Sequence, residues 1–97
     1  MAQVVWNRKA VRQFEKIQEY LSKEFGDKTT EEFTKRVFNF LDLLSDYPDL
    51  GTVENKERNI RGFLLHRHTT LFYKIGSDKI YLLAMFDNRQ DPKKPKY

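Results

Sequence analysis

Three short β-type runs, separated by turns, dominate the second half of the chain and determine what the first half must supply. They span residues 59–65, 69–75 and 79–87. Gly76-Ser77-Asp78 is a strong turn signal, whereas His66-Arg67-His68 predicts a hairpin connection without a glycine. Both alternating sets of the third run are apolar, with Ile80, Leu82, Ala84 and Phe86 on one side and Tyr81, Leu83 and Met85 on the other. Such a strand is usually central, so we expect helices on one face of the sheet and the C-terminal segment or a partner on the other.

The first half of the chain is suited to cover that sheet. A short β-type run, Gln3–Trp6, is followed by two apolar patterns with helical spacing. Asn7 is the predicted N-cap of the first helix and Gly26 its C-cap. Thr29 and Glu32 fit a capping box for the second helix. The apolar residues are Ala10, Phe14, Ile17, Leu21 and Phe25 in the first helix, and Phe33, Val37, Phe40, Leu41 and Leu44 in the second.

The short connection between the two helices, about three residues, predicts an antiparallel αα-hairpin. Pro48 ends the second helix, and residues 48–57 are polar and rich in turn signals, so we expect a loop there. The predicted fold class is α+β, with the order β-α-α-β-β-β and the αα-hairpin packed on a mainly antiparallel four-stranded sheet. The 97 residues are expected to form a single domain, 1–97.

The positive charge of the chain is concentrated in its second half. Residues 1–55 hold 8 Lys and Arg against 10 Asp and Glu, whereas residues 56–97 hold 10 against 4. This distribution permits an anionic partner, either nucleic acid or an acidic protein. There is no cysteine and there are two histidines, so we expect no disulfide, metal or other cofactor. Without a secretory signal or an apolar run of the ~20 residues that span a bilayer, we expect a cytoplasmic protein with no membrane partner.

Four segments carry a resemblance to a known family: VVWNRKA, PDLG, NIRGFLLHRHTTLFYKI and IYLLAMFDNRQDP. The most specific parts are the hydrophobic-hydrophobic-Tyr motif at Leu71-Phe72-Tyr73 and the Asp-x-Arg-x-x-Pro motif at Asp87, Arg89 and Pro92. With the predicted element order, these motifs make the chain resemble the RelE/ParE superfamily of bacterial toxins from type II toxin–antitoxin systems, also called the plasmid stabilisation family. The resemblance covers nearly the whole chain.

The resemblance implies a small cytoplasmic toxin that inhibits growth under stress and is neutralised by a cognate antitoxin in a toxin–antitoxin hetero-oligomer. Antitoxins of the superfamily usually wrap an extended or helical segment around the toxin. RelE-like members cut mRNA on the ribosome, whereas ParE-like members poison DNA gyrase and are not nucleases. A third alternative is a non-toxic module with the toxin fold that holds nucleic acid by charge alone.

Candidate site residues follow from the chemistry that each branch needs. A metal-independent endoribonuclease lets the ribose 2′-OH attack the adjacent phosphate, which requires proton transfer and cationic stabilisation. Arg61, His68 and Arg89 are the catalytic candidates for that activity, because histidine titrates near neutral pH and arginine can donate two hydrogen bonds to phosphate. The candidate binding residues are Lys56, Arg58, Arg67, Lys93, Lys94 and Lys96.

One departure from the superfamily pattern favours the ParE-like branch. Many RelE-like nucleases carry an arginine immediately before the hydrophobic-hydrophobic-Tyr motif, and this chain has Thr70 there. A hydroxyl cannot replace a guanidinium that faces a phosphate, so Arg67 would have to compensate from an earlier position. Tyr97 resembles the late tyrosine of some nucleases, but its spacing from Arg89 is longer than usual. We therefore favour a gyrase poison and keep ribosome-dependent mRNA cleavage as the alternative.

Overall fold

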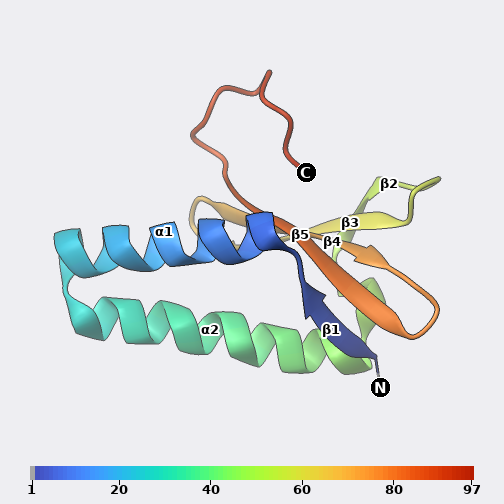
Figure 1. The fold of residues 1–97 in the computed structure, drawn as a ribbon, viewed down its shortest axis with the longest axis horizontal. Helices are drawn as coiled ribbons and strands as arrows, with labels where there is room; N and C mark the ends of the chain where they lie inside the picture. Colours follow the sequence, from blue (N-terminus) through green and yellow to red (C-terminus); the bar gives the residue numbers. More distant parts are fainter. Residues whose placement is uncertain (1) are drawn as a thin grey trace.

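Two helices cover one face of a five-stranded sheet in the computed structural model, which describes residues 2–97 (Figure 1). The elements are β1 (Gln3–Trp6), α1 (Arg8–Phe25), α2 (Asp27–Asp46), the 3₁₀ turn η1 (Pro48–Leu50), β2 (Thr52–Asn55), β3 (Ile60–His66), β4 (Thr69–Ile75) and β5 (Lys79–Asp87). The strand order is β1-β5-β4-β3-β2, with β1 parallel to β5 and the other neighbours antiparallel. The predicted α+β class, with an αα-hairpin on a mainly antiparallel sheet, is confirmed.

A single residue, Gly26, connects α1 to α2 in the helical hairpin. Asn7 caps α1 as predicted, since its Oδ1 accepts the backbone N–H of Ala10 at 2.8 Å. Gly26 has a φ of 92°, a backbone conformation that favours glycine, so the chain reverses within one residue. Helix α2 therefore begins directly after Gly26, and the predicted capping box at Thr29 is wrong. The Thr29 hydroxyl instead donates to the Phe25 carbonyl at 3.5 Å.

The core lies between the helices and the sheet. Val37 and Leu44 of α2 and Leu71, Ile80 and Leu82 of the sheet are fully buried there. Burying such a side chain contributes roughly 1.5–3 kcal/mol of hydrophobic stabilisation. Phe40 of α2 stacks on Phe63 of β3 with 4.1 Å between the ring centroids, so α2 lies along β3. None of the helices in residues 2–97 has the length and apolarity needed to cross a bilayer.

The sheet has one strand more than the sequence predicts. The expected loop over residues 48–57 is wrong for Thr52–Asn55, which forms the edge strand β2. In this strand Thr52 pairs with Gly62, and Val53 pairs with Arg61. The segment is short and polar, and it becomes a strand because β3 offers it a free edge. The predicted four-stranded sheet is therefore a five-stranded one.

A bulge in β5 changes which residues face the helices. Phe72 pairs with Ala84 and Tyr73 with Leu82, so Leu83 is an extra residue without a partner on β4. An extra residue reverses the alternation of every side chain beyond it. The predicted division into two alternating sets is therefore wrong beyond this point. Ile80, Leu82 and Met85 belong to the helix-side core, whereas Ala84 and Phe86 belong to the cluster on the opposite face.

The opposite face of the sheet is covered by the end of the chain, as expected. The segment after β5 rises away from the sheet and curves back towards it (Figure 1). The Tyr97 ring packs on Phe72 with 5.0 Å between centroids, and Phe72 lies 6.4 Å from Phe86. This small aromatic cluster is separate from the main core.

Candidate functional site

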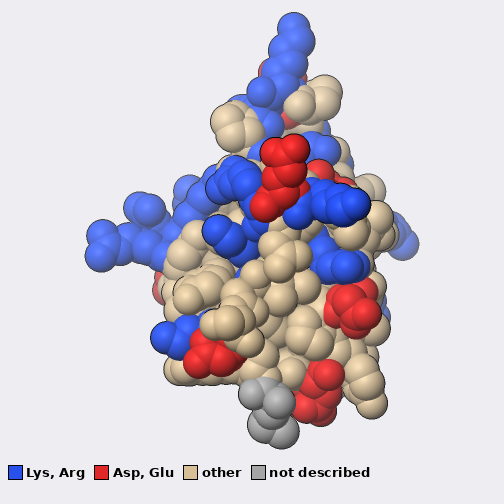
Figure 2. Space-filling view, turned by 90° about the vertical axis from the view of Figure 1, so that its right-hand side faces the viewer, with Lys and Arg blue, Asp and Glu red and all other residues tan. Residues whose placement is uncertain are grey.

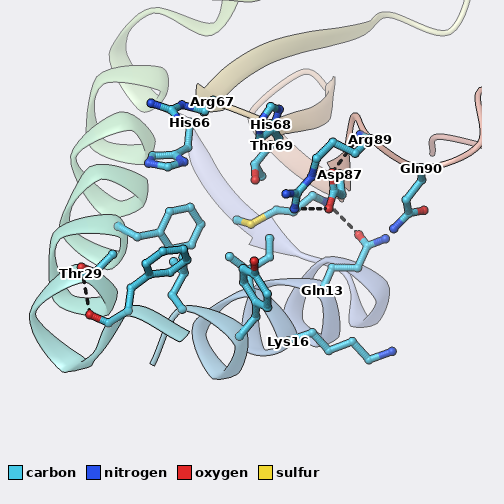
Figure 3. Close-up of a pocket in the computed structure, with 16 residues that line it drawn as sticks. Gln13, Lys16, Thr29, His66, Arg67, His68, Thr69, Asp87, Arg89 and Gln90 are labelled. Carbon is cyan, nitrogen blue, oxygen red and sulfur yellow. Dashed lines mark hydrogen bonds and ion pairs between the residues drawn. The ribbon is translucent and has the colours of Figure 1, made fainter. Parts of the chain in front are cut away.

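A cavity of about 630 Å³ opens between the αα-hairpin and the turn that joins β3 to β4 (Figure 3). Its floor is apolar, because Leu21 of α1, Phe33 of α2 and Met85 of β5 are buried there. Tyr20 and Phe25 extend this floor to the tip of the hairpin, with their rings edge to face at 6.2 Å. The cavity can therefore receive an apolar group.

The rim of the cavity is cationic. Lys16 comes from α1, Arg67 and His68 from the β3–β4 turn, and Arg89 from the segment after β5. Among the described lining residues, Asp87 is the single acid against three Lys and Arg. The charge of the rim therefore favours an anionic ligand or partner.

Asp87 and Arg89 of the Asp-x-Arg motif bind each other at this rim (Figure 3). The Arg89 Nε donates to Asp87 Oδ1 at 3.0 Å and its Nη2 to Oδ2 at 2.9 Å, so the contact is bidentate. The Arg89 backbone N–H also donates to Asp87 Oδ1 at 2.9 Å. The hydrogen bonds from Arg89 lower the pKa of the Asp87 carboxyl, and the same contact raises the pKa of the Arg89 guanidinium.

His66 lies at the wall of the cavity against Phe33, with centroids 6.0 Å apart and ring planes at 89°. Desolvation at this wall lowers the pKa of His66, and the positive charges of Arg36 and Arg67 and the neighbouring His68 lower it further. The imidazole is therefore neutral at neutral pH, and one of its nitrogens can accept a proton.

The structure brings some of the predicted site residues together and leaves others apart. The cavity is lined by Arg67, His68 and Arg89. Two further cations, Lys56 and Arg58, lie in the turn between β2 and β3, and three lysines, Lys93, Lys94 and Lys96, follow β5. In the view of Figure 2, Lys and Arg gather in the upper half, where the segment after β5 rises above the sheet, while the lower half is mostly uncharged with scattered acidic and basic groups.

Arg61 and Tyr73 organise the loop that follows α2. The Arg61 Nη1 donates to the carbonyls of Asp49 at 3.2 Å and Gly51 at 2.7 Å. Tyr73 is fully buried, and its hydroxyl donates to the Pro48 carbonyl and accepts the Gly51 N–H, both at 2.8 Å. The PDLG segment and the hydrophobic-hydrophobic-Tyr motif therefore form one hydrogen-bonded unit, which their spacing in the sequence does not reveal.

Arg61 is consequently separated from His68 and Arg89. It pairs with Tyr73, roughly 13 Å along β4 from Thr69, where the β3–β4 turn ends. Its guanidinium also faces the α2 side of the sheet, because it bonds the loop after that helix. The three catalytic candidates do not converge on one point.

Thr70 lies on the sheet face away from the helices and is hydrogen-bonded to Asn88. The Asn88 Nδ2 donates to Thr70 Oγ1 at 2.8 Å, and Thr70 Oγ1 lies 3.1 Å from Asn88 Oδ1. The position before the hydrophobic-hydrophobic-Tyr motif is thus occupied by a neutral hydroxyl–amide pair. Tyr97 and Phe72 add apolar rings to the same face.

Gln13 is a lining residue that sequence reasoning missed. Its Oε1 accepts the Met85 backbone N–H at 2.8 Å, which ties α1 to β5 beside the cavity (Figure 3). The sequence signal was a polar residue within the apolar stripe of α1, between Ala10 and Ile17. Residues 2–97 contain no group of three or more His, Cys, Asp or Glu side chains placed to hold a metal ion.

The helix pair on one face of a mixed sheet, together with the Asp-x-Arg pair at the cavity, defines a toxin of the RelE/ParE superfamily. Within this superfamily, the chain belongs to the ParE toxin family. The family described as the ParE toxin of the type II toxin–antitoxin system parDE matches residues 4–92. No curated protein sequence matches the chain at a significant level.

Solved structures of similar fold come from several bacteria. A chain of the chromosomal ParDE system from P. aeruginosa has a TM-score of 0.73 and 16% identity, over 90% of this chain and 96% of that one. The YoeB dimer from Staphylococcus aureus gives 0.62 and 10%, over 87% and 93%. A YoeB/ParE toxin from Agrobacterium tumefaciens gives 0.61 and 8%, over 88% and 97%. At these identities the likeness shows the fold alone.

Proposed function

We propose that the protein is a ParE-like toxin that arrests growth by binding DNA gyrase, and that a cognate antitoxin neutralises it in a toxin–antitoxin complex. The antitoxin is supported by the family, whose members are toxins of type II systems, and by the similar ParDE structure. The choice of gyrase depends on one observation above all. The neutral Thr70–Asn88 pair occupies the position where many RelE-like nucleases have an arginine.

A neutral pair at this position is unfavourable for phosphate chemistry. Each preorganised donor aimed at the developing negative charge contributes on the order of 10²–10³ in rate, and a guanidinium is always charged and can donate two hydrogen bonds to a phosphate. The hydroxyl of Thr70 and the amide of Asn88 satisfy each other instead. The partly exposed Tyr97 ring, which packs on buried Phe72, adds an aromatic group to the same face, and such a group suits contact with a protein.

Two of the candidate catalytic arginines already bind other groups of the protein, and this also supports the proposal. Arg61 bonds the carbonyls of the loop after α2, and the fork of Arg89 is filled by Asp87. Both guanidinium groups would have to leave these partners to reach a phosphate. The lysines that follow β5 are not bound in this way, and we assign them to the DNA phosphates held by gyrase.

One observation favours a second candidate, a ribosome-dependent mRNA endoribonuclease. Arg67, His68 and Arg89 line a single cavity that is wide enough for a nucleotide. In this alternative His68 transfers the proton, and the two arginines stabilise the charge on the phosphate. Arg67 then replaces the arginine that is absent at position 70.

A pulse of toxin expression separates the two targets. Messenger RNA 5′ ends and gyrase-dependent DNA breaks are mapped in the same cells within minutes of induction, with and without the antitoxin. We expect DNA breaks, intact mRNA and relief by the antitoxin. New mRNA ends without DNA breaks would contradict the gyrase proposal, and unimpaired growth at verified soluble expression would indicate a non-toxic binding module.

Variants assign the candidate residues to one target or the other. For a gyrase poison, replacing Lys93, Lys94 and Lys96 together with Gln weakens growth arrest, because phosphate contacts are lost. The matched control replaces Lys23, Lys28 and Lys35 of the helices with Gln and removes the same charge. For a nuclease, His68→Gln instead flattens the pH dependence of cleavage, and Arg89→Ala lowers its rate by on the order of 10²–10³.

A further inference from the structure

The stretch from the second half of α2 to β2, which does not line the cavity, carries the opposite charge to the cavity rim. Between Val37 and Asn55 the sequence contains four acidic residues and no Lys or Arg, although the chain has a net charge of +4. Asp42, Asp46 and Asp49 of this stretch are all exposed. They come from the second half of α2 and from η1.

Exposed apolar side chains lie beside these acids. Leu43 is 48% exposed, Tyr47 57%, Leu50 40% and Val53 48%. The stacked Phe40–Phe63 pair shows which side of α2 lies along β3. Leu43 follows Phe40 by about one turn on that side, and Tyr47 comes directly after the helix. Val53 belongs to β2, which has β3 as its neighbour and is the last strand of the sheet. The four apolar residues therefore follow the border between α2 and the edge of the sheet.

One of these acids, Asp46, is placed where it opposes the stability of α2. The C-terminal end of a helix carries partial negative charge, so a carboxylate there is unfavourable. Asp46 is the last residue of α2, and its last turn contains no basic residue. Within residues 2–97 the one ion pair is that of Arg89 with Asp87, so none of these acids forms an ion pair, although the Arg61 guanidinium lies beside Asp49. A local charge placement that opposes the fold is expected at functional sites.

This surface is also held rigidly from beneath. Tyr73 and Arg61 together make four hydrogen bonds to the segment from Pro48 to Gly51. A Cβ atom on Gly51 would lie 2.8 Å from both the Gly62 carbonyl oxygen and the Tyr73 hydroxyl, so the loop backbone packs directly against β3 and Tyr73 at this point. A rigid surface loses little conformational entropy when a partner binds to it.

We propose that Leu43, Tyr47, Leu50 and Val53, with Asp42, Asp46 and Asp49, form a docking surface for a segment of the target protein that combines Lys or Arg with apolar side chains. The assignment to the target rests on the proposed function. The cationic cavity selects an acidic segment, whereas this surface selects a basic one, so we assign the two surfaces to different partners, the cavity to the antitoxin and the docking surface to DNA gyrase. Apolar contacts supply the affinity, and the carboxylates select a basic partner.

Charge reversal tests this proposal without endangering the fold. The variant Asp42→Lys/Asp46→Lys places positive charge at the C-terminal end of α2, where it stabilises a helix. The matched control is Glu15→Lys/Glu19→Lys, which reverses two exposed acids with the same spacing on α1. Growth arrest, affinity for purified gyrase at several salt concentrations, affinity for the antitoxin and the melting temperature are measured for both variants. A second variant, Tyr47→Ser/Val53→Ser, removes the apolar contacts.

We expect both docking-surface variants to bind gyrase about tenfold more weakly or worse and to lose growth arrest. Their antitoxin affinity stays within about twofold of the parent, and the charge-reversed variant melts no lower than the parent. Growth arrest and gyrase affinity equal to those of the parent and the control would overturn the proposal, as would loss of antitoxin binding in place of gyrase binding. A third outcome is possible: the parent arrests growth without binding gyrase, and the docking-surface variants lose growth arrest while the control keeps it. The docking surface would then be supported, and the identification of gyrase as the target would be wrong. If the parent neither arrests growth nor binds gyrase, both proposals fail.

Discussion

The two ends of the molecule are held together in different ways. At the cavity end, where the β3–β4 turn meets the segment after β5, the defining contact is the Asp87–Arg89 pair, whose side chains are 34% and 56% exposed. At the loop end, where α2, η1 and β2 meet, the defining contacts are the hydrogen bonds of buried Tyr73. An exposed ion pair contributes little stability, whereas a buried hydrogen bond is costly to break.

This difference indicates how the two ends can serve recognition. The cavity end can change its charges with little effect on folding, because its polar groups already lie in water. The loop end cannot easily change its backbone, but its outward side chains are free to vary on a fixed frame. We therefore expect substitutions to have large effects on stability beneath the loop end and small effects around the cavity.

The largest expected effect separates the two sides of α2 at the loop end. Leu41 is 5% exposed and lies in the core, whereas Leu43 is an exposed residue of the docking surface. Leu41→Ala should lower the free energy of unfolding by about 2–5 kcal/mol, through lost burial and an unfilled cavity. Leu43→Ala should change it by about 0.5 kcal/mol or less. Urea denaturation of both variants measures this difference, and equal losses would contradict the assignment of the two faces.

A smaller effect is expected from the hydroxyl that holds the loop. Tyr73→Phe leaves the Gly51 N–H and the Pro48 carbonyl without their partner, which should cost about 1–3 kcal/mol of unfolding free energy. Tyr47→Phe removes a hydroxyl from an exposed ring of the same loop and is the matched control. Chemical denaturation of the two variants compares them directly. If Tyr73→Phe is as stable as the control, the loop end is not held by these bonds.

At the cavity end we expect a small, pH-dependent effect. The pKa of Asp87 is lowered from its ordinary value of 3.8, chiefly by the hydrogen bonds of Arg89. The stabilisation is therefore present above pH 3.8 and is lost as the pH falls through the lower folded-state pKa. Parent and Asp87→Asn should differ slightly in melting temperature at pH 6 and converge at about pH 2. A difference that persists in acid would show that the pair acts through packing rather than charge.

The smallest expected effect concerns the titration of His66. Desolvation and the nearby positive charges lower its pKa from the ordinary value of 6.5, so the folded state binds this proton less readily than the unfolded state. Stability is therefore full above pH 6.5 and decreases below it until the folded-state pKa is reached. NMR titration should place the midpoint of His66 below 6.5, and Arg67→Gln should raise it. An unchanged midpoint in this variant would remove the Arg67 charge from the explanation.

Much of the fold could be predicted from local patterns. The helical stripes, the Asn7 cap, Gly26 and the runs 69–75 and 79–87 all depend on residues close in sequence, and the structure confirms them. The edge strand β2 and the bulge at Leu83 were not predicted, because each depends on a neighbouring strand. The helix start at Asp27 was missed because the capping pattern at Thr29 competes with a glycine that turns the chain at once.

The candidate site shows the same division between local and distant causes. The sequence identified Arg67, His68 and Arg89, since histidine and arginine are the natural groups for phosphate or acidic partners, and the structure places all three at one cavity. It could not show that Arg61 lies apart from them. The Arg61 side chain donates hydrogen bonds to the loop after α2. Its partners, Asp49 and Gly51, are 12 and 10 residues away in the sequence.

The sequence by itself determined the class of this protein: its α+β fold class, its uneven charge and its membership of a toxin superfamily. These properties follow from periodicity, composition and motifs, which are local or additive along the chain. Only the tertiary structure decided which charges share a surface and which are used to hold the fold. That outcome depends on strand order, on a one-residue bulge and on a buried tyrosine, and each of these arises from contacts between distant segments.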